Sequence, residues 1–231
     1  MAFPQVAAAN GGVDNTDRAI GANYAVNLPA GIVAGNLLLI IITVRPDSSA
    51  ATIRLNFPAG WNECYYVKAG GLYVGIQAEY RIADGAEGAS INATVANENC
   101  LGVAYVTYRI TGYSGIPLGS ALAIGGTDST PDPPDLAPGW GAKDILWIAV
   151  HGSTKNVTVW PAGFGNTVEQ AGDAVCSCCR LELNAASKNP GTFTISAATR
   201  WCAATLGVQP AGAATVTPKP SAAAKFIMAG G

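Results

Sequence analysis

The chain alternates apolar and polar residues over several stretches, and this alternation predicts β-strands. In residues 72–82 every second side chain is apolar or aromatic. Residues 175–183 show a similar alternation about a hundred positions later. Neighbouring side chains of a strand point to opposite faces of a sheet, so a period of two predicts a strand with one buried face. We therefore expect the intervening residues, such as Gln77 and Glu79, to face outward.

Further strands are predicted on both sides of these stretches. Residues 32–44 form the longest apolar run and are typical of a buried strand. Residues 89–95 alternate like the stretches above, and so do residues 192–197. Residues 101–110 and 201–208 complete the set as two more strands. Turns rich in Gly and Pro separate these segments, since Gly permits a positive φ and Pro fixes φ.

Short motifs occur twice along the chain, roughly a hundred residues apart, and they set the expected architecture. The recurring motifs are Leu28 Pro29 Ala30 Gly31 with Leu136 Ala137 Pro138 Gly139, Phe57 Pro58 Ala59 Gly60 Trp61 with Trp160 Pro161 Ala162 Gly163 Phe164, and Cys100 with Cys202. Two copies are too few for a solenoid, so the pattern predicts a duplicated β-structure. The expected fold is all-β: a jelly-roll-like β-sandwich with an internal pseudo-repeat of two halves, each of roughly 100 residues.

The predicted organisation divides the chain into five segments. They are an N-terminal segment 1–26, a first half 27–112, a crossover loop 113–135, a second half 136–210 and a C-terminal segment 211–231. Two arrangements fit this pattern: each half folds as its own small sandwich, or the halves interleave and each sheet takes strands from both. We favour one interleaved sandwich over residues 27–210, because interleaving removes exposed sheet edges.

The composition is unusually poor in charge. Charged residues make up 12% of the chain and hydrophobic residues 49%, whereas about 25% charged is usual for soluble proteins. A surface with so few charges has little protection against association, so we expect other subunits to cover much of it.

The charge and the apolar runs of the chain disfavour two classes of partner, nucleic acid and membrane. The net charge is −2 with only 13 Lys and Arg residues, which leaves no basic stripe for nucleic acid. The longest apolar run is too short to cross a bilayer as a helix, and the N-terminus lacks the features of a secretory signal. We therefore expect neither nucleic acid nor membrane as partner, and synthesis in a cytoplasm.

Cysteine and histidine offer few routes to chemistry. The chain has six Cys and one His, His151. Strand alternation directs Cys179 away from Cys176 and Cys178, which disfavours a zinc site built on them. The reduced state is the expected default, and Cys176 or Cys178 with Cys202 is the first disulfide pair to test. We predict no catalytic, cofactor-binding or metal-binding residues.

Clustered oxygens and exposed aromatics are the remaining candidates for ligand contacts. The segments 14–17 and 84–87 carry oxygens of the kind that calcium uses, but neither has the full loop spacing, so we expect solvated turns. Tyr65, Tyr66 and Trp140 are candidates for stacking on sugar rings.

A series of Gly, Pro and apolar motifs between residues 27 and 210 resembles a group of tailed-bacteriophage virion proteins. The motifs are Asn27 Leu28 Pro29 Ala30 Gly31, Gly35 Asn36 Leu37 Leu38 Leu39, Pro58 Ala59 Gly60 Trp61, Tyr80 Arg81 Ile82 Ala83 Asp84 Gly85, Tyr108 Arg109 Ile110 Thr111 Gly112, Leu146 Trp147 Ile148 Ala149 and Pro190 Gly191 Thr192 Phe193 Thr194. Members of that group are β-rich structural, decoration or tail-fibre proteins, and the resemblance brings no catalytic residue with it. In this chain Asn36 stands where Asp is common, and the cysteines are unusual.

The resemblance and the composition together predict a non-enzymatic virion component. The expected role is a capsid decoration (cement) protein on the capsid exterior, bridging major capsid protein subunits and other copies of itself as a dimer or trimer. We expect sheet edges, residues 1–12 and residues 219–231 to provide the attachment. The alternatives are a tail or head fibre that recognises host glycans and a tail-tube or neck subunit.

Overall fold

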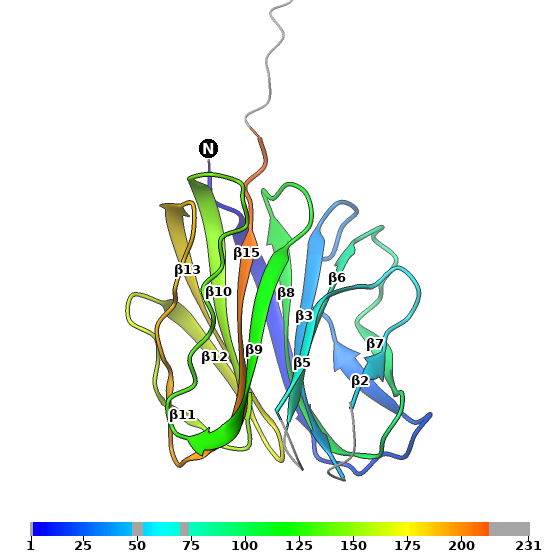
Figure 1. Ribbon diagram of the computed structural model, residues 1–231. Helices are drawn as coiled ribbons and strands as arrows, with labels where there is room; N and C mark the ends of the chain where they lie inside the picture. The colour runs from blue at the N-terminus through cyan, green and yellow to red at the C-terminus, as the bar shows by residue number, and fades with distance from the viewer. Residues whose placement is uncertain (1, 48–52, 70–73, 213–231) are drawn as a thin grey trace, which may run out of the picture.

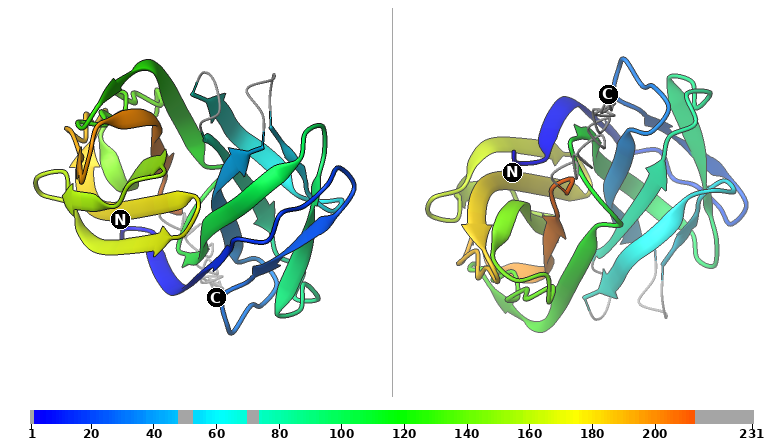
Figure 2. Two further views of the ribbon diagram at one scale, coloured as in Figure 1. Left: turned by 90° about the horizontal axis from the view of Figure 1, so that it is seen from below. Right: turned by 90° about the horizontal axis from the view of Figure 1, so that it is seen from above.

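A computed structural model of the chain describes residues 2–47, 53–69 and 74–212 (Figure 1). These residues form fifteen β-strands and no helix, and every pairing between strands is antiparallel. The all-β class is therefore confirmed. Figure 2, which views the molecule end-on, shows two lobes side by side, one from each half of the chain.

The first lobe contains eight strands in two sheets. They are β1 (Gln5–Asp14), β2 (Asn23–Asn27), β3 (Leu37–Pro46), β4 (Leu55–Asn56), β5 (Asn62–Lys68), β6 (Gly75–Ile82), β7 (Ser90–Val95) and β8 (Cys100–Thr111). The larger sheet has the order β1-β8-β3-β6-β5, and the smaller sheet has the order β2-β7-β4.

The second lobe contains seven strands, also in two sheets. They are β9 (Leu118–Asp128), β10 (Lys143–Ser153), β11 (Val157–Val159), β12 (Gly165–Ala171), β13 (Val175–Ala185), β14 (Thr194–Ile195) and β15 (Thr199–Val208). The larger sheet has the order β12-β13-β10-β15-β9, and β11 pairs with β14.

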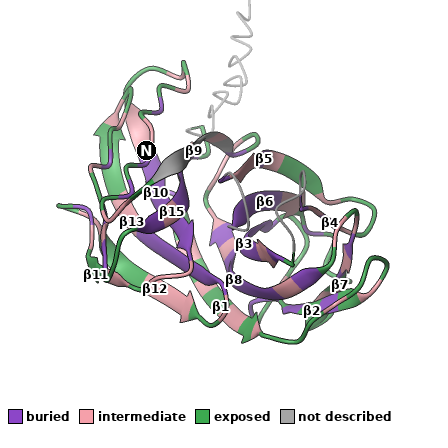
Figure 3. Ribbon diagram, turned by 60° about the horizontal axis from the view of Figure 1, so that its bottom comes forward, coloured by how far each residue is buried: buried purple, intermediate pink, exposed green. Residues whose placement is uncertain are grey.

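The two larger sheets pack face to face, so both of their faces are buried. Along β3, Leu37, Leu39 and Ile41 face the other lobe and share a core with Ile148 and Val150 of β10. The alternate residues of β3 contribute instead to a second core, inside the first lobe beneath β2 and β7. The most deeply buried strands accordingly lie at the centre of each lobe and between the lobes (Figure 3).

This packing overturns the expectation that one face of these strands points outward. Gln77 and Glu79 are 3% and 5% exposed, because their face of β6 is covered within the first lobe. Cys176 and Cys178 of β13 are fully buried between the lobes. A strand covered on both faces can still alternate in polarity when its polar side chains find hydrogen-bond partners.

The predicted interleaving of strands is wrong. Each five-stranded sheet takes all of its strands from one half of the chain. The physical reason is that each larger sheet has two apolar faces. Its own half of the chain covers one of them, and the larger sheet of the other lobe covers the other. The arrangement with one sandwich in each half is the closer of the two alternatives.

Two of the expected boundary segments contain strands. Residues 113–135 were expected to be a loop but include β9, which pairs with β15. Residues 1–12 were expected to be a separable attachment segment, but most of them belong to β1, which pairs with β8 along its length. Removing them would therefore take an edge strand from the larger sheet of the first lobe. The other expected attachment segment, residues 219–231, lies outside the described residues.

Candidate functional site

Two arginines hold the Pro-Ala-Gly turns of the first lobe. Arg109 of β8 donates from Nε to the carbonyl oxygen of Ala30 at 3.0 Å, and Arg81 of β6 donates from Nη1 to the carbonyl oxygen of Ala59 at 3.2 Å. The glycine after each alanine has a positive φ, 72° at Gly31, which a residue without Cβ adopts without strain. Each turn is thus fixed by an arginine from a strand of the larger sheet.

Arg81 also organises the loop that follows its own strand. Its guanidinium pairs with Asp84 at 2.6 Å and with Glu87 at 3.2 Å. The Glu87 carboxylate further accepts the backbone N–H groups of Asp84 at 2.7 Å and Gly85 at 3.1 Å. The Ala86 N–H, which donates to the Asp84 carboxylate, lowers the pKa of that carboxyl. The oxygens of segment 84–87 are therefore occupied by N–H donors of the loop itself.

The second oxygen-rich segment has a similar local structure. The Asp14 carboxylate accepts the Thr16 N–H at 2.9 Å and pairs with Arg18 at 3.0 Å. Across residues 2–47, 53–69 and 74–212, no group of three or more His, Cys, Asp or Glu side chains is placed to hold a metal ion.

An open groove of about 540 Å³ lies between two loops. One is the turn around Ala30, which Arg109 holds, and the other is the loop around Glu87, which Arg81 holds. We call these the arginine-held loops. Its walls are residues 28–32 and residues 85 and 87–89, and Asn10 and Asn27 also line it. Glu87 is the titratable residue among those that line the groove, and its carboxylate is already used as described above. The Asn10 amide is also used within the protein, since it donates to the carbonyl oxygen of Leu28 and accepts the Gly11 N–H. The groove therefore offers backbone groups, the Asn27 amide and small apolar surfaces, which suit the binding of a neutral segment.

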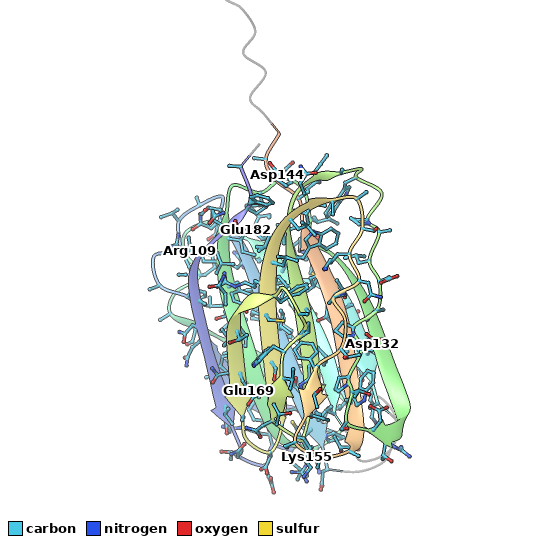
Figure 4. The ribbon with its side chains drawn as sticks, turned by 90° about the vertical axis from the view of Figure 1, so that its left-hand side faces the viewer. Arg109, Asp132, Asp144, Lys155, Glu169 and Glu182 are labelled. Atoms are coloured by element: carbon cyan, nitrogen blue, oxygen red, sulfur yellow. The ribbon has the colours of Figure 1, made fainter. Side chains whose placement is uncertain are left out.

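His151 lies inside the second lobe, away from solvent. Its Nδ1 atom is 3.4 Å from Ser177 Oγ, and Ser177 in turn donates to Glu169 at 2.9 Å. The ring packs against Phe193 with centroids 5.7 Å apart. Burial lowers the pKa of His151 to about 3, so the ring is neutral at physiological pH. Nothing in the sequence singles out Ser177 of β13 as the partner of His151, or Glu169 of β12 as the partner of Ser177; Figure 4 labels Glu169 on β12.

All six cysteines are free thiols. Cys176 and Cys178 face the first lobe, whereas Cys179 packs inside the second lobe with Phe193, which confirms the predicted alternation. A disulfide from Cys202 to Cys176 or Cys178, the first pair to test, is ruled out, because β10 lies between their strands β15 and β13; Cys176 and Cys202 are the clearest case. These residues pair with Gly152 from opposite sides, so two strand spacings, about 10 Å, separate them, and a disulfide needs Cα atoms within about 7 Å.

The aromatic residues predicted to stack on sugars do not form one surface. Tyr65 is buried in the core between the lobes. Tyr66 lies beneath the guanidinium of Arg54, 4.0 Å from the ring centre, and Trp140 packs against the second lobe beside Leu136 and Trp147. Tyr65 in particular is unavailable to a sugar.

The arginines that hold the turns were not singled out from the sequence, although a signal for them exists. Arg81 and Arg109 both occur in the tripeptide Tyr-Arg-Ile. In both tripeptides the arginine lies on the opposite face of its strand from the residues before and after it.

Comparison of the chain with protein-family models, with curated proteins and with solved structures finds no match. In the part of the chain that the structure describes, no helix is long and apolar enough to cross a membrane.

Proposed function

We propose that this protein is a non-enzymatic structural component of a bacteriophage virion, specifically a capsid decoration (cement) protein. In this proposal it is made in the host cytoplasm, associates as a dimer or trimer and bridges major capsid protein subunits on the capsid exterior. The observation that carries the proposal is the groove between the arginine-held loops. A fixed, neutral groove binds a segment of a neighbouring subunit without requiring that segment to carry charge.

The proposal includes a finer description of the fold. We propose that each half is a jelly roll and that the halves arose by duplication. The order β1-β8-β3-β6-β5 in the first lobe and β9-β15-β10-β13-β12 in the second lobe supports this, since corresponding strands occupy corresponding positions. The smaller sheets support it as well: β7 pairs with β4 as β14 pairs with β11.

The low charge of the chain supports a cementing role. Only 12% of residues are charged, and beside the groove Arg81 pairs with both Asp84 and Glu87. Repeated weak contacts between many copies become strong through multivalency, so no single contact needs a large buried area.

The test uses particles and a matched pair of variants. Ala30 is exposed in the wall of the groove, so Ala30→Arg should block the groove and lower the number of copies bound per particle by about tenfold, a loss of about 1.4 kcal/mol per contact. Ala59→Arg is the control, because Ala59 is exposed in the corresponding turn outside the groove lining. Copy number is measured by quantitative gel analysis of purified virions. A few wild-type copies per virion, or equal occupancy by both variants, would overturn the proposal.

A second candidate function is a fibre module that binds host glycans. The exposed amide side chain of Asn27 in the groove favours it, because amides donate to and accept from sugar hydroxyls. Glycan-array binding by the wild type and Ala59→Arg but not by Ala30→Arg would support this candidate over the cement role. Absence of binding by the wild type would exclude it for the glycans tested.

A further inference from the structure

Arg180 of β13 lies at the junction of the two lobes. Its guanidinium carbon is 5.4 Å from the ring centre of Tyr108, a residue of β8 in the other lobe. Stacking on an aromatic face leaves the planar edge of a guanidinium free to donate hydrogen bonds. Arg180 is therefore oriented by one lobe and attached to the other.

Arg180 differs in its hydrogen bonds from five of the other arginines. Arg18, Arg45, Arg54 and Arg81 each pair with a carboxylate, and Arg109 donates to Ala30 and Asn36. Within the described residues, Arg180 has no such acceptor; its Nε atom is buried without a hydrogen-bond partner, as the Nε atom of Arg18 is too. A buried N–H donor without an acceptor is costly. In Arg18 the ion pair to Asp14 satisfies another part of the guanidinium, whereas Arg180 makes no such bond to any residue that the structure describes.

A cavity of about 310 Å³ opens beside this side chain. It is lined by Leu146, Gly165, Asn166, Arg180, Leu181 and Glu182. Asn166 has a φ of 49° and is the one non-glycine residue with a positive φ among the residues described. Asn166 lies in the register shift of β12 between Gly165 and Val168, and asparagine adopts this backbone conformation more readily than most residues. The cavity thus combines an uncommitted cation, an amide side chain and apolar walls.

Glu182 limits which anion the cavity can accept. It is two residues from Arg180 on the same strand, so the two side chains emerge on one face roughly 7 Å apart. Gln5 of β1 donates to Glu182 Oε1 at 3.0 Å, across the junction of the lobes. Figure 4 shows Glu182 near the upper end of β13. A second negative charge in the cavity is repelled by this carboxylate, and a dianion is repelled more than a monoanion.

We propose that this cavity is a binding site for a single carboxylate group, held by the guanidinium edge of Arg180. A carboxylate has two oxygens in a plane, which match two N–H donors of a guanidinium, and the bidentate pair is stronger than a single hydrogen bond. The carboxylate belongs to a small organic acid or to an acidic side chain of a protein partner. This inference does not depend on the proposed virion function.

The test follows the Arg180 Nε–H signal by two-dimensional NMR of the full chain at pH 7.5. Sodium acetate, sodium phosphate and sodium chloride are titrated separately at one constant ionic strength. Acetate should shift the signal to saturation, whereas phosphate and chloride should not. N-acetyl-glutamate amide, which represents an acidic side chain of a protein, is titrated in the same way. Binding of this capped residue at least tenfold tighter than acetate, about 1.4 kcal/mol, assigns the carboxylate to a protein partner, and equal binding assigns it to a free acid.

Matched variants keep the result interpretable. Arg180→Lys retains the charge but loses the planar fork, so it should bind acetate about tenfold more weakly than the wild type. The affinity is measured from the backbone amide shifts around Asn166 as acetate is added. Lys155→Gln is the control, because Lys155 lies at the opposite end of the lobe (Figure 4) and the variant changes the net charge elsewhere. A wild-type signal that does not saturate with acetate, saturation with phosphate as strong as with acetate, or unchanged acetate affinity in Arg180→Lys overturns the proposal.

Discussion

Arg81 and Arg109 lie directly opposite Leu38, one on each side of it, in the two strands that flank β3. Each belongs to a Tyr-Arg-Ile tripeptide, and Ile82 and Ile110 both lie opposite Leu37 in the same register. Residues directly opposite one another in adjacent strands share a face of the sheet. Neighbouring positions on one face of the sheet therefore supply Arg109, which holds the turn at Ala30 in the groove wall, and Arg81, which holds the turn at Ala59 and the loop at residues 84–87.

Replacing Arg109 should loosen the turn beside the groove. Arg109→Met keeps an apolar stem of similar length but loses the bonds to Ala30 and Asn36, which lie at 3.0 Å and 3.3 Å. Loss of hydrogen bonds from a charged donor should lower the free energy of unfolding by about 1–2 kcal/mol. Faster amide hydrogen exchange at residues 30–36 would locate the effect. Lys155→Met is the control and should leave exchange in these residues unchanged; equal effects of both variants would contradict the explanation.

Gly152 marks a close approach between the lobes. A Cβ atom at this position would lie 2.6 Å from Cγ1 of Ile76 and 2.8 Å from Oγ1 of Thr43. Gly152→Ala should therefore force the larger sheets apart and lower the free energy of unfolding by about 1–3 kcal/mol, as overpacking does. Chemical denaturation measures the change. Gly165→Ala is the control, because no atom lies within 4 Å of its Cβ position, and its effect should stay within about 0.5 kcal/mol.

Glu79 should make the protein less stable as the pH rises. Burial raises its pKa from 4.5 to about 7, while the Gln77 amide and Arg54 oppose the shift and Glu63 adds to it. Because the folded state holds the proton more tightly than the unfolded state, the free energy of unfolding should fall as the pH rises from about 4.5 to about 7.

The Glu79→Gln variant isolates this contribution. It keeps the shape of the side chain and removes the titration, so its stability should exceed that of the wild type at pH 8 and approach it at pH 5. Denaturation at both pH values measures the difference. Asp132→Asn, at an exposed carboxylate, is the control; a pH dependence that is identical in Glu79→Gln and wild type would rule out this assignment.

His151 should have the opposite effect, in acid. Its pKa falls from 6.5 to about 3 because burial disfavours the charged ring. The unfolded state therefore takes up a proton more readily, and stability should be lost as the pH falls from about 6.5 to about 3. At pH 5 the loss should reach about 2 kcal/mol relative to pH 7.5.

His151→Leu removes this loss. The variant leaves the bond from Ser177 to Glu169 in place and removes the Nε2 atom, which has no hydrogen-bond partner. Comparison of denaturation at pH 5 and pH 7.5 measures the effect. A wild-type stability that does not decline between these values faster than that of His151→Leu would show that the buried ring is not responsible.

Alternation of side chains was sufficient to find most of the strands. The period of two in residues 72–82 and 175–183 corresponds to β6 and β13, and the faces of Cys176, Cys178 and Cys179 follow it. Local chemistry was also sufficient for the turns, because Gly31 and Gly60 do adopt a positive φ. The candidate groove was not predictable, because its walls come from loops about sixty residues apart in the sequence and the arginines that hold them come from two further strands.

The sequence by itself determined the all-β class, the strands and the turns, because these depend on neighbours along the chain. Tertiary structure alone decided which faces were covered. Gln77 and Glu79 look like solvent-facing residues in the sequence, yet they are buried because the first lobe closes over their side of β6. It also decided that Cys176 and Cys202 cannot bond, since β10 lies between their strands, and that Arg180 meets Tyr108 at the junction of the lobes. The physical reason is that burial and pairing depend on contacts between distant segments, and these follow from how whole sheets pack.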